Sequence, residues 1–237
     1  ITLPYLVRTI GIENFGLVNF ALSLGLYFGA IIQFGFSITA TREIARHRDD
    51  SAKLVQIYSA TLTASILLAL ASAILFTLIV FLFDKFNSHL NLYLFTLVFV
   101  VFQNLFPIWF FQGMEKMKYI TFLTLGTNLI FLVSLFVFVK QEDDFVLVPL
   151  LNATAAFITF VIAIALINKQ FKVSFTTPGI QEIKSIYQNG HHAFISQLAP
   201  NFYNNSAVFF LGLFSNNLLV GVYAAATKVI DAIISFA

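Results

Sequence analysis

Lys228 and Asp231 are the residues whose type and spacing point most directly to chemistry. Both lie in an apolar stretch, and a charge inside an apolar helix is costly enough to be a functional hypothesis by default. Residues three apart share one face of a helix. Two interpretations stay open. The residues form an intrahelical ion pair that neutralises both groups, or Lys228 binds an anionic group such as a phosphate while Asp231 takes up a proton or Na⁺.

Two arginines lie near the ends of apolar stretches. Arg8 either extends its charge to the lipid headgroups or binds a phosphate through its planar guanidinium. Arg42 precedes the charged run 46–50, which reads RHRDD. This run either anchors the topology of the chain or attracts an anionic headgroup by its electric field.

A dense polar cluster follows Pro200 and consists of Asn201, Tyr203, Asn204 and Asn205. Amide and phenol groups form hydrogen bonds readily, so the cluster is our best candidate for contacts to sugar hydroxyls. The alternative is packing between helices.

Other polar groups are spread along the chain. We expect most of the scattered carboxamides to join helices by hydrogen bonds and a few to contact sugar hydroxyls. They are Gln33, Gln103, Asn104, Gln112, Asn128 and Asn152. The adjacent His191 and His192 point about 100° apart on a helix, which is poor geometry for a metal. The chain has no cysteine, which excludes disulfides and metal sites built from thiolates. We expect neither a metal site nor a cofactor.

The elements that must position these residues are apolar stretches without Asp, Glu, Lys or Arg. Each is longer than the roughly 20 residues that cross a bilayer as a helix. They lie between residues 13 and 42, 53 and 84, 85 and 115, 118 and 140, and 144 and 169. Hydrophobic residues make up 59% of the chain and charged residues 10%. The sequence therefore predicts an all-α, polytopic membrane protein.

The stretches predict one partial helix and seven further helices. Their ranges are 1–10, 15–39, 54–83, 90–112, 120–139, 145–167, 190–214 and 218 onward. Pro107 and Pro200 lie inside two of them and each frees a backbone carbonyl. Both ends of the sequence interrupt apolar stretches, so we expect a fragment of a longer protein.

The connections between these helices alternate sides, which separates the basic residues. One side carries nine of them, Arg42, Arg46, Arg48, Lys53, Lys116, Lys118, Lys169, Lys172 and Lys184. The other side carries three, Arg8, Lys85 and Lys140. Basic residues concentrate on the cytoplasmic side of membrane proteins. We therefore expect the side with nine to face the cytoplasm.

Two segments of the chain are similar to each other. Residues 14–21 (NFGLVNFA) resemble residues 219–226 (LVGVYAAA), with Gly16 matching Gly221 at an offset of 205 (221 − 16). Parallel repeats of this kind occur in transporters, with the substrate path between the halves. We therefore expect residues 1–184 to belong to a first bundle, with its first helix truncated, and residues 185–237 to be the first two helices of a second.

Several strings resemble the Wzx-type polysaccharide flippases, which share a superfamily with the multidrug-extruding MATE proteins. The strings are LPYLVRT at 3–9, GIENFG at 11–16, FGF at 34–36 followed by ATREIA at 40–45, PIWFFQGMEKM at 107–117 and VGVY at 220–223. The resemblance implies about twelve or more helices in two six-helix bundles, of which this chain covers the first and the start of the second.

The resemblance also implies a function in the bacterial plasma (inner) membrane. Such proteins turn oligosaccharide units on undecaprenyl pyrophosphate from the inner to the outer leaflet, for O-antigen or capsule synthesis. Lys228 would then meet the pyrophosphate. The expected partners are the lipid-linked oligosaccharide, membrane lipids and polysaccharide polymerase or chain-length machinery. The net charge of +2 is too small to suggest nucleic acid.

Two other functions stay open. One is a cation-coupled exporter of drugs or small solutes on the same scaffold. The other is a membrane enzyme such as a glycan polymerase or ligase, which we would expect to place an acid, base or nucleophile in a sizeable exterior loop. The exterior loops 84–89, 140–144 and 215–217 are short, which argues against the enzyme.

Overall fold

The computed structural model describes residues 2–234, and within helix α10 it leaves the side chains of Asn201, Asn204 and Asn205 outside the described residues. The described part consists of helices and connections, with no strand. In order, the elements are α1 (Thr2–Thr9), α2 (Gly11–Gln33), α3 (Phe36–Arg46), α4 (Ser51–Leu82), α5 (Asp84–Asn87), α6 (Leu90–Leu105), α7 (Ile108–Gly113), α8 (Met117–Phe138), the 3₁₀ turn η1 (Glu142–Val146), α9 (Leu147–Phe171), α10 (Ile180–Phe214) and α11 (Asn217–Ile234).

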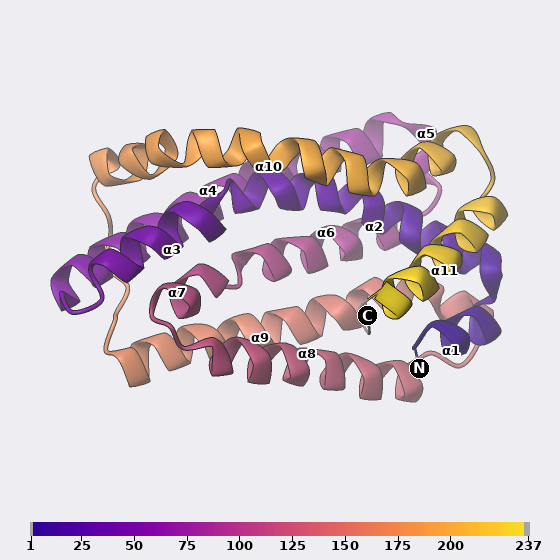
Figure 1. Ribbon diagram of the computed structural model, residues 1–237. Coiled ribbons are helices and arrows are strands. Elements are labelled where there is room, and N and C mark those ends of the chain that lie inside the picture. Colours follow the sequence, from indigo (N-terminus) through magenta and orange to yellow (C-terminus); the bar gives the residue numbers. More distant parts are fainter. Residues whose placement is uncertain (1, 235–237) are drawn as a thin grey trace.

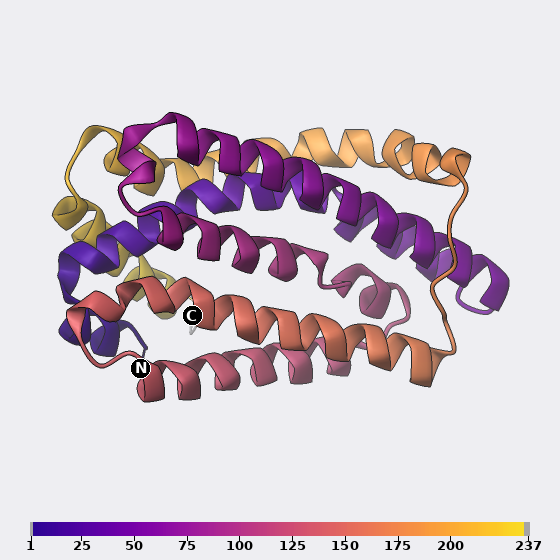
Figure 2. The same cartoon turned by 180° about the vertical axis from the view of Figure 1, so that it is seen from behind.

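The long helices lie roughly side by side along one axis, with their connections at two ends (Figures 1 and 2). Six helical stretches are long and apolar enough to cross a bilayer. They are Gly11–Arg46, Ser51–Leu82, Leu90–Gly113, Met117–Phe138, Glu142–Phe171 and Asn217–Ile234. The prediction of an all-α, polytopic membrane protein is confirmed.

Helix α2 is the centre of the packing. It contacts α1, α4, α6, α10 and α11, and its side chains Phe20 and Leu24 are buried in a cluster with Phe76 of α4 and Tyr93 of α6. Helix α9 packs on α6 and carries α8 on another side. Because so many elements meet α2, its residues are the ones that position the candidate site.

The apolar stretch predicted as a single helix over 15–39 contains a break at Phe34 and Gly35. Both residues have left-handed backbone angles, with φ of 41° and 72°. A Cβ added at Gly35 would lie 2.8 Å from the Ala193 Cβ atom, so α10 approaches closely here. The Phe34 ring stacks on Phe194 with centroids 4.6 Å apart. Contact with α10 thus accompanies the break, which apolar composition alone does not indicate.

The two prolines act differently. Pro107 interrupts the predicted helix over 90–112, so that α6 ends at Leu105 and α7 begins at Ile108. Phe106 before it has φ −58° and ψ 120°, the extended conformation that a following proline favours. Pro200 lies inside the continuous helix α10.

Polar contacts show which connections lie together. At one end, Arg48 binds Glu115 at 2.7 Å, and the Thr176 N–H donates to Ser59 Oγ at 2.9 Å. The first contact joins the α3–α4 and α7–α8 connections, and the second holds the α9–α10 connection against α4. We call this the basic end, because the nine basic residues lie in or near these connections.

The opposite end is held by two other contacts. The Tyr5 hydroxyl donates to the Val139 carbonyl at 2.7 Å, and Lys85 Nζ donates to the Leu213 carbonyl at 2.7 Å. The connections therefore alternate between two ends, as the sequence predicts. That the basic end faces the cytoplasm stays a prediction.

Candidate functional site

The closest helix approach near the predicted ion site is the crossing of α2 and α11 (Figure 1). A Cβ added at Gly16 would collide with the Asn217 carbonyl oxygen and lie 2.7 Å from the Gly221 nitrogen. A Cβ added at Gly221 would collide with the Ile12 carbonyl oxygen. Small residues of this kind let two membrane helices bring their backbones together.

This glycine crossing is reciprocal. Gly16 contacts Asn217, and Gly221 contacts Ile12. Ile12 and Asn217 occupy equivalent positions in the two segments, as do Gly16 and Gly221, because each pair is 205 residues apart (217 − 12 and 221 − 16). A two-fold axis produces this kind of contact, in which a first position of each segment meets a second position of the other. The offset is the one found between the similar segments of the sequence, so the crossing brings these two segments into direct contact.

Lys228 lies on the face of α11 that carries the glycine crossing. Gly221, Ala224 and Lys228 are spaced by three and four residues and so share that face. The Lys228 Nζ atom lies 5.0 Å from the centroid of the Phe15 ring on α2, within the range of a cation–π interaction. Phe15 is a partner that the sequence did not indicate.

Asp231 is exposed one turn further along α11. Within residues 2–234, no salt bridge joins it to Lys228. The intrahelical ion pair is therefore not the arrangement in this structure. The ammonium group instead lies over the face of the Phe15 ring.

The two arginines lie at opposite ends of the molecule. Arg8 is exposed near the end of α1, on the side of the glycine crossing. Arg42 lies at the basic end, where its Nε atom is 3.8 Å from Glu43, a carboxylate that also receives Arg46 at 3.3 Å. One bound group therefore cannot meet both arginines in this conformation.

The polar cluster on α10 runs alongside α2. The ring of Phe202 packs on Tyr27 with centroids 4.9 Å apart, and the Tyr27 hydroxyl donates to Ser206 at 3.4 Å. Tyr203 is 84% exposed. The side chains of Asn201, Asn204 and Asn205 lie outside the described residues, so their sugar contacts stay a prediction.

Five of the six scattered carboxamides line one cavity of about 390 Å³ between α2, α6, α8 and α9. We call it the amide cavity, after its amide residues Gln33, Gln103, Asn104, Asn128 and Asn152. This grouping is not visible in the sequence, because the residues come from four helices and have no common spacing.

The expectation that these amides join helices by hydrogen bonds was wrong for this group. Asn104 and Asn152 donate to carbonyls of their own helices, Val100 at 2.8 Å and Val148 at 3.1 Å. Gln112, the sixth carboxamide, does accept a hydrogen bond from another helix, donated by Thr41 at 3.3 Å. Among the described residues, Gln33, Gln103 and Asn128 form no side-chain hydrogen bond to another helix.

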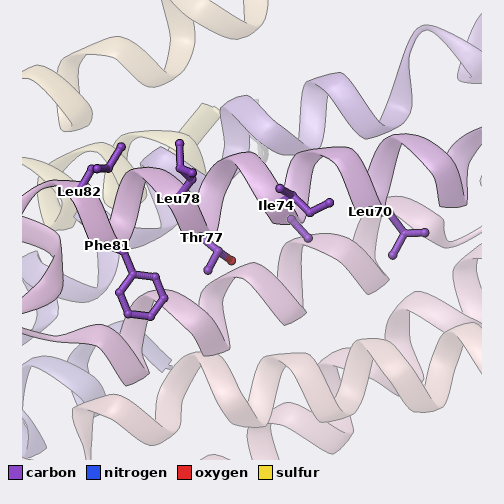
Figure 3. Close-up of a pocket in the computed structure, with 7 residues that line it drawn as sticks. Leu70, Ile74, Thr77, Leu78, Phe81 and Leu82 are labelled. Carbon is purple, nitrogen blue, oxygen red and sulfur yellow. The ribbon is translucent and has the colours of Figure 1, made fainter.

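A larger hollow lies on the outer face of α4. This groove of about 580 Å³ is lined by α4 alone, with Leu70, Ile74, Leu78 and Phe81 among its apolar side chains (Figure 3). One helix cannot surround a ligand, and Thr77 is the groove's only hydroxyl. We read the groove as surface that faces lipid.

Hydrogen bonds hold two carboxylates at the connections. One from Arg48 keeps the pKa of Glu115, which lies outside the spans, below its ordinary value. The backbone N–H groups of Lys140 and Gln141 donate to Asp144 at 2.8 and 3.0 Å. The described residues hold no cluster of three or more His, Cys, Asp or Glu for a metal ion.

Comparison with known proteins gives the wider context. The chain is 30% identical over 233 residues to the "Putative O-antigen transporter" of Escherichia coli (strain K12). The matched region covers 98% of this chain and 56% of that protein. It is 27% identical over 228 residues to the "Putative O-antigen transporter" of Shigella dysenteriae, covering 96% and 57%. The chain thus spans about half the length of these relatives. No solved structure matches it.

The profile of the family described as "Polysaccharide biosynthesis protein" matches residues 1–237. This match covers the strings that suggested the resemblance and the helices that form the glycine crossing and the amide cavity. On this evidence the chain belongs to the polysaccharide biosynthesis protein family.

Proposed function

We propose that this chain is part of a flippase that moves oligosaccharide units on undecaprenyl pyrophosphate across the bacterial inner membrane. The observation that carries the proposal is the similarity to two proteins named as O-antigen transporters, which extends over 98% and 96% of the chain. These relatives are longer than the chain, so the activity, the substrate and any polymerase partner are proposals about the complete protein.

The proposed path runs between two bundles. Residues 1–184 contribute to the first, and residues 185–237 begin the second. The reciprocal contact of Gly16 with Gly221 supports this division, because repeats related by an axis along the membrane normal place their substrate path between the halves. The glycine crossing would close that path at the end opposite the basic end.

The candidate residues take separate roles along this path. Lys228 and Arg8 would contact the pyrophosphate, and Asp231 would bind the coupling proton or Na⁺. Lys228 follows the start of α11 at Asn217 by eleven residues, roughly 16 Å at 1.5 Å per residue, so it lies deep in the span. Arg42 at the basic end would collect the anionic headgroup, and the cluster Asn201, Tyr203, Asn204 and Asn205 would contact sugars.

Orientation is a separate part of the proposal. The basic end should face the cytoplasm because it holds nine basic residues against three. Fusions at Asp50 or Thr177 to a reporter that is active only outside the cell should be inactive, whereas fusions at Ser88 should be active. The reverse pattern would overturn the orientation.

The function itself is tested with the complete protein in vesicles. A lipid-linked oligosaccharide is placed in one leaflet, and its appearance in the other is measured. We expect leaflet exchange of this lipid and no uptake of cationic drugs. Drug uptake without movement of the lipid would favour the exporter and contradict the flippase.

The role of Lys228 is tested in a flippase-deficient strain. We expect Lys228→Ala to abolish glycan display while the protein still accumulates, because the path loses its cation, and Lys228→Arg to restore at least part of the activity. Protein levels are checked by blot. Normal display by Lys228→Ala would remove the phosphate role, and loss of the protein itself would favour a structural one.

A further inference from the structure

The amide cavity is polar but carries no charge. Besides its five carboxamides, its lining includes the hydroxyls of Thr124, Thr127 and Thr159, and none of its lining residues is Asp, Glu, Lys, Arg or His. A pyrophosphate site is expected to present Arg or Lys side chains, and this lining has neither. The chemistry of this lining therefore fits an uncharged ligand.

Much of the hydrogen-bonding capacity in the cavity is unused. Each carboxamide has one acceptor oxygen and two N–H donors. Asn104 and Asn152 each donate one hydrogen bond to a carbonyl of their own helix. Gln33, Gln103 and Asn128 form no side-chain hydrogen bond among the described residues. Gln103 and Asn128 are exposed, so their amide groups are accessible to a ligand that offers several donors and acceptors.

The size of the cavity argues against one bridging water. Its volume of about 390 Å³ compares with roughly 30 Å³ for a water molecule in the liquid and lies within the range of ligand pockets. Three phenylalanines, Phe99, Phe102 and Phe106, supply flat apolar faces in the same lining. Hydroxyls around a ring with an apolar C–H face would satisfy both kinds of surface, and this combination describes a sugar.

The backbone is shaped to admit the amides. A Cβ at Gly29 would lie 2.7 Å from the Nδ2 atom of Asn104. Any other residue at position 29 would therefore displace the Asn104 amide. The cavity also adjoins both helix breaks, since Gln33 precedes the Phe34–Gly35 break and Phe106 precedes Pro107. A ligand here would contact the ends of both interrupted helices.

We propose that the amide cavity binds uncharged sugar residues of the transported glycan, inside the first bundle and apart from the charged path at Lys228. The source of the sugar rests on the proposed function. The amides supply the hydrogen bonds, the phenylalanines supply the stacking faces, and the absence of charge in the lining leaves the pyrophosphate to the path between the bundles.

The test measures binding by the complete protein of two synthetic lipids. One is a polyprenyl pyrophosphate that carries a neutral disaccharide, and the other is the same lipid without sugar. The main variant is Gln103→Leu with Asn128→Leu, because neither side chain has a protein partner that folding would lose. The matched control is Gln112→Leu, an amide of the same bundle outside the cavity.

We expect the wild-type protein and Gln112→Leu to prefer the glycosylated lipid. The double variant should lose roughly tenfold of that preference, the order of one or two lost hydrogen bonds, and should bind the bare lipid as before. An unchanged preference in the double variant would overturn the sugar site while leaving the flippase intact. Failure of the wild-type protein to bind either lipid would overturn the flippase and the sugar site together.

If the double variant does not accumulate, Asn152→Ser provides the second measurement, since serine keeps a hydroxyl and removes bulk. It should reduce the preference by less than the double variant. An unaltered preference in a folded Asn152→Ser protein would count against the proposal.

Discussion

Helices α2 and α4 are both long and apolar, yet one lies at the centre of the molecule and the other at its outer face. Helix α2 contains glycines that admit a neighbour: Gly16 meets α11, Gly25 approaches Val100, and Gly29 approaches Asn104. Helix α4 has no glycine and ends in large exposed side chains such as Ile74 and Phe81. Apolar composition is enough to place both in the membrane, and small residues decide which one is surrounded by other helices.

The comparison also explains why the larger hollow is not the candidate site. The α4 groove has the greater volume, but it is open and apolar (Figure 3). The smaller amide cavity has walls from four helices, which meet around the C-terminal half of α2. A site needs walls on several sides and directed polar groups, and a single lipid-facing helix provides neither.

The largest effect should come from breaking the central position of α2. We expect Gly16→Leu to abolish transport and to lower stability by at least the ~1–3 kcal/mol typical of overpacking, because the added side chain collides with the Asn217 carbonyl. The matched control is Gly126→Leu on α8, where a Cβ would meet nothing within 4 Å. Melting temperature and glycan display are measured; equal behaviour of the two variants would contradict the glycine crossing.

A smaller effect should come from one chemical change made in both helices. Leu24 on α2 is 5% exposed, and Leu70 on α4 is 58% exposed. Leu24→Ala should cost about 2–4 kcal/mol through the cavity it leaves, whereas Leu70→Ala should stay within about 0.5 kcal/mol. Unfolding of both variants in one detergent gives the difference. Similar losses would show that α4 is covered by protein rather than lipid.

The smallest effect concerns the charges that hold the basic end. Because Arg48 lowers the pKa of Glu115, the pair stabilises the fold above the ordinary carboxyl pKa, and the benefit is lost as pH falls through the lowered value. Glu115→Gln should therefore melt slightly below the wild-type protein at pH 7, and the gap should close below about pH 4. Exposed pairs contribute little, so a large gap at pH 7 would mean that charge rivals the packing of α2.

Some site features could be predicted from single residues and others could not. Lys228 was recognisable because any cation in a span needs an explanation, but its neighbour Phe15 lies 213 positions away (228 − 15). Gly16 and Gly221 were matched by sequence similarity, whereas their direct contact required the crossing of α2 and α11. The break at Phe34–Gly35 was not predicted, since glycines are common inside membrane helices and the close approach of α10 is a tertiary fact.

The sequence by itself determined that the chain is helical and spans a membrane, and where most of its helices turn, because long charge-free runs have few other stable states in lipid. It also determined which side of the bundle holds the basic residues, since alternation follows from counting spans. Only the tertiary structure decided which apolar helix is central and which amides share a cavity. Hydrophobicity does not direct one membrane helix toward another, so those choices depend on close backbone contacts between residues far apart in the chain.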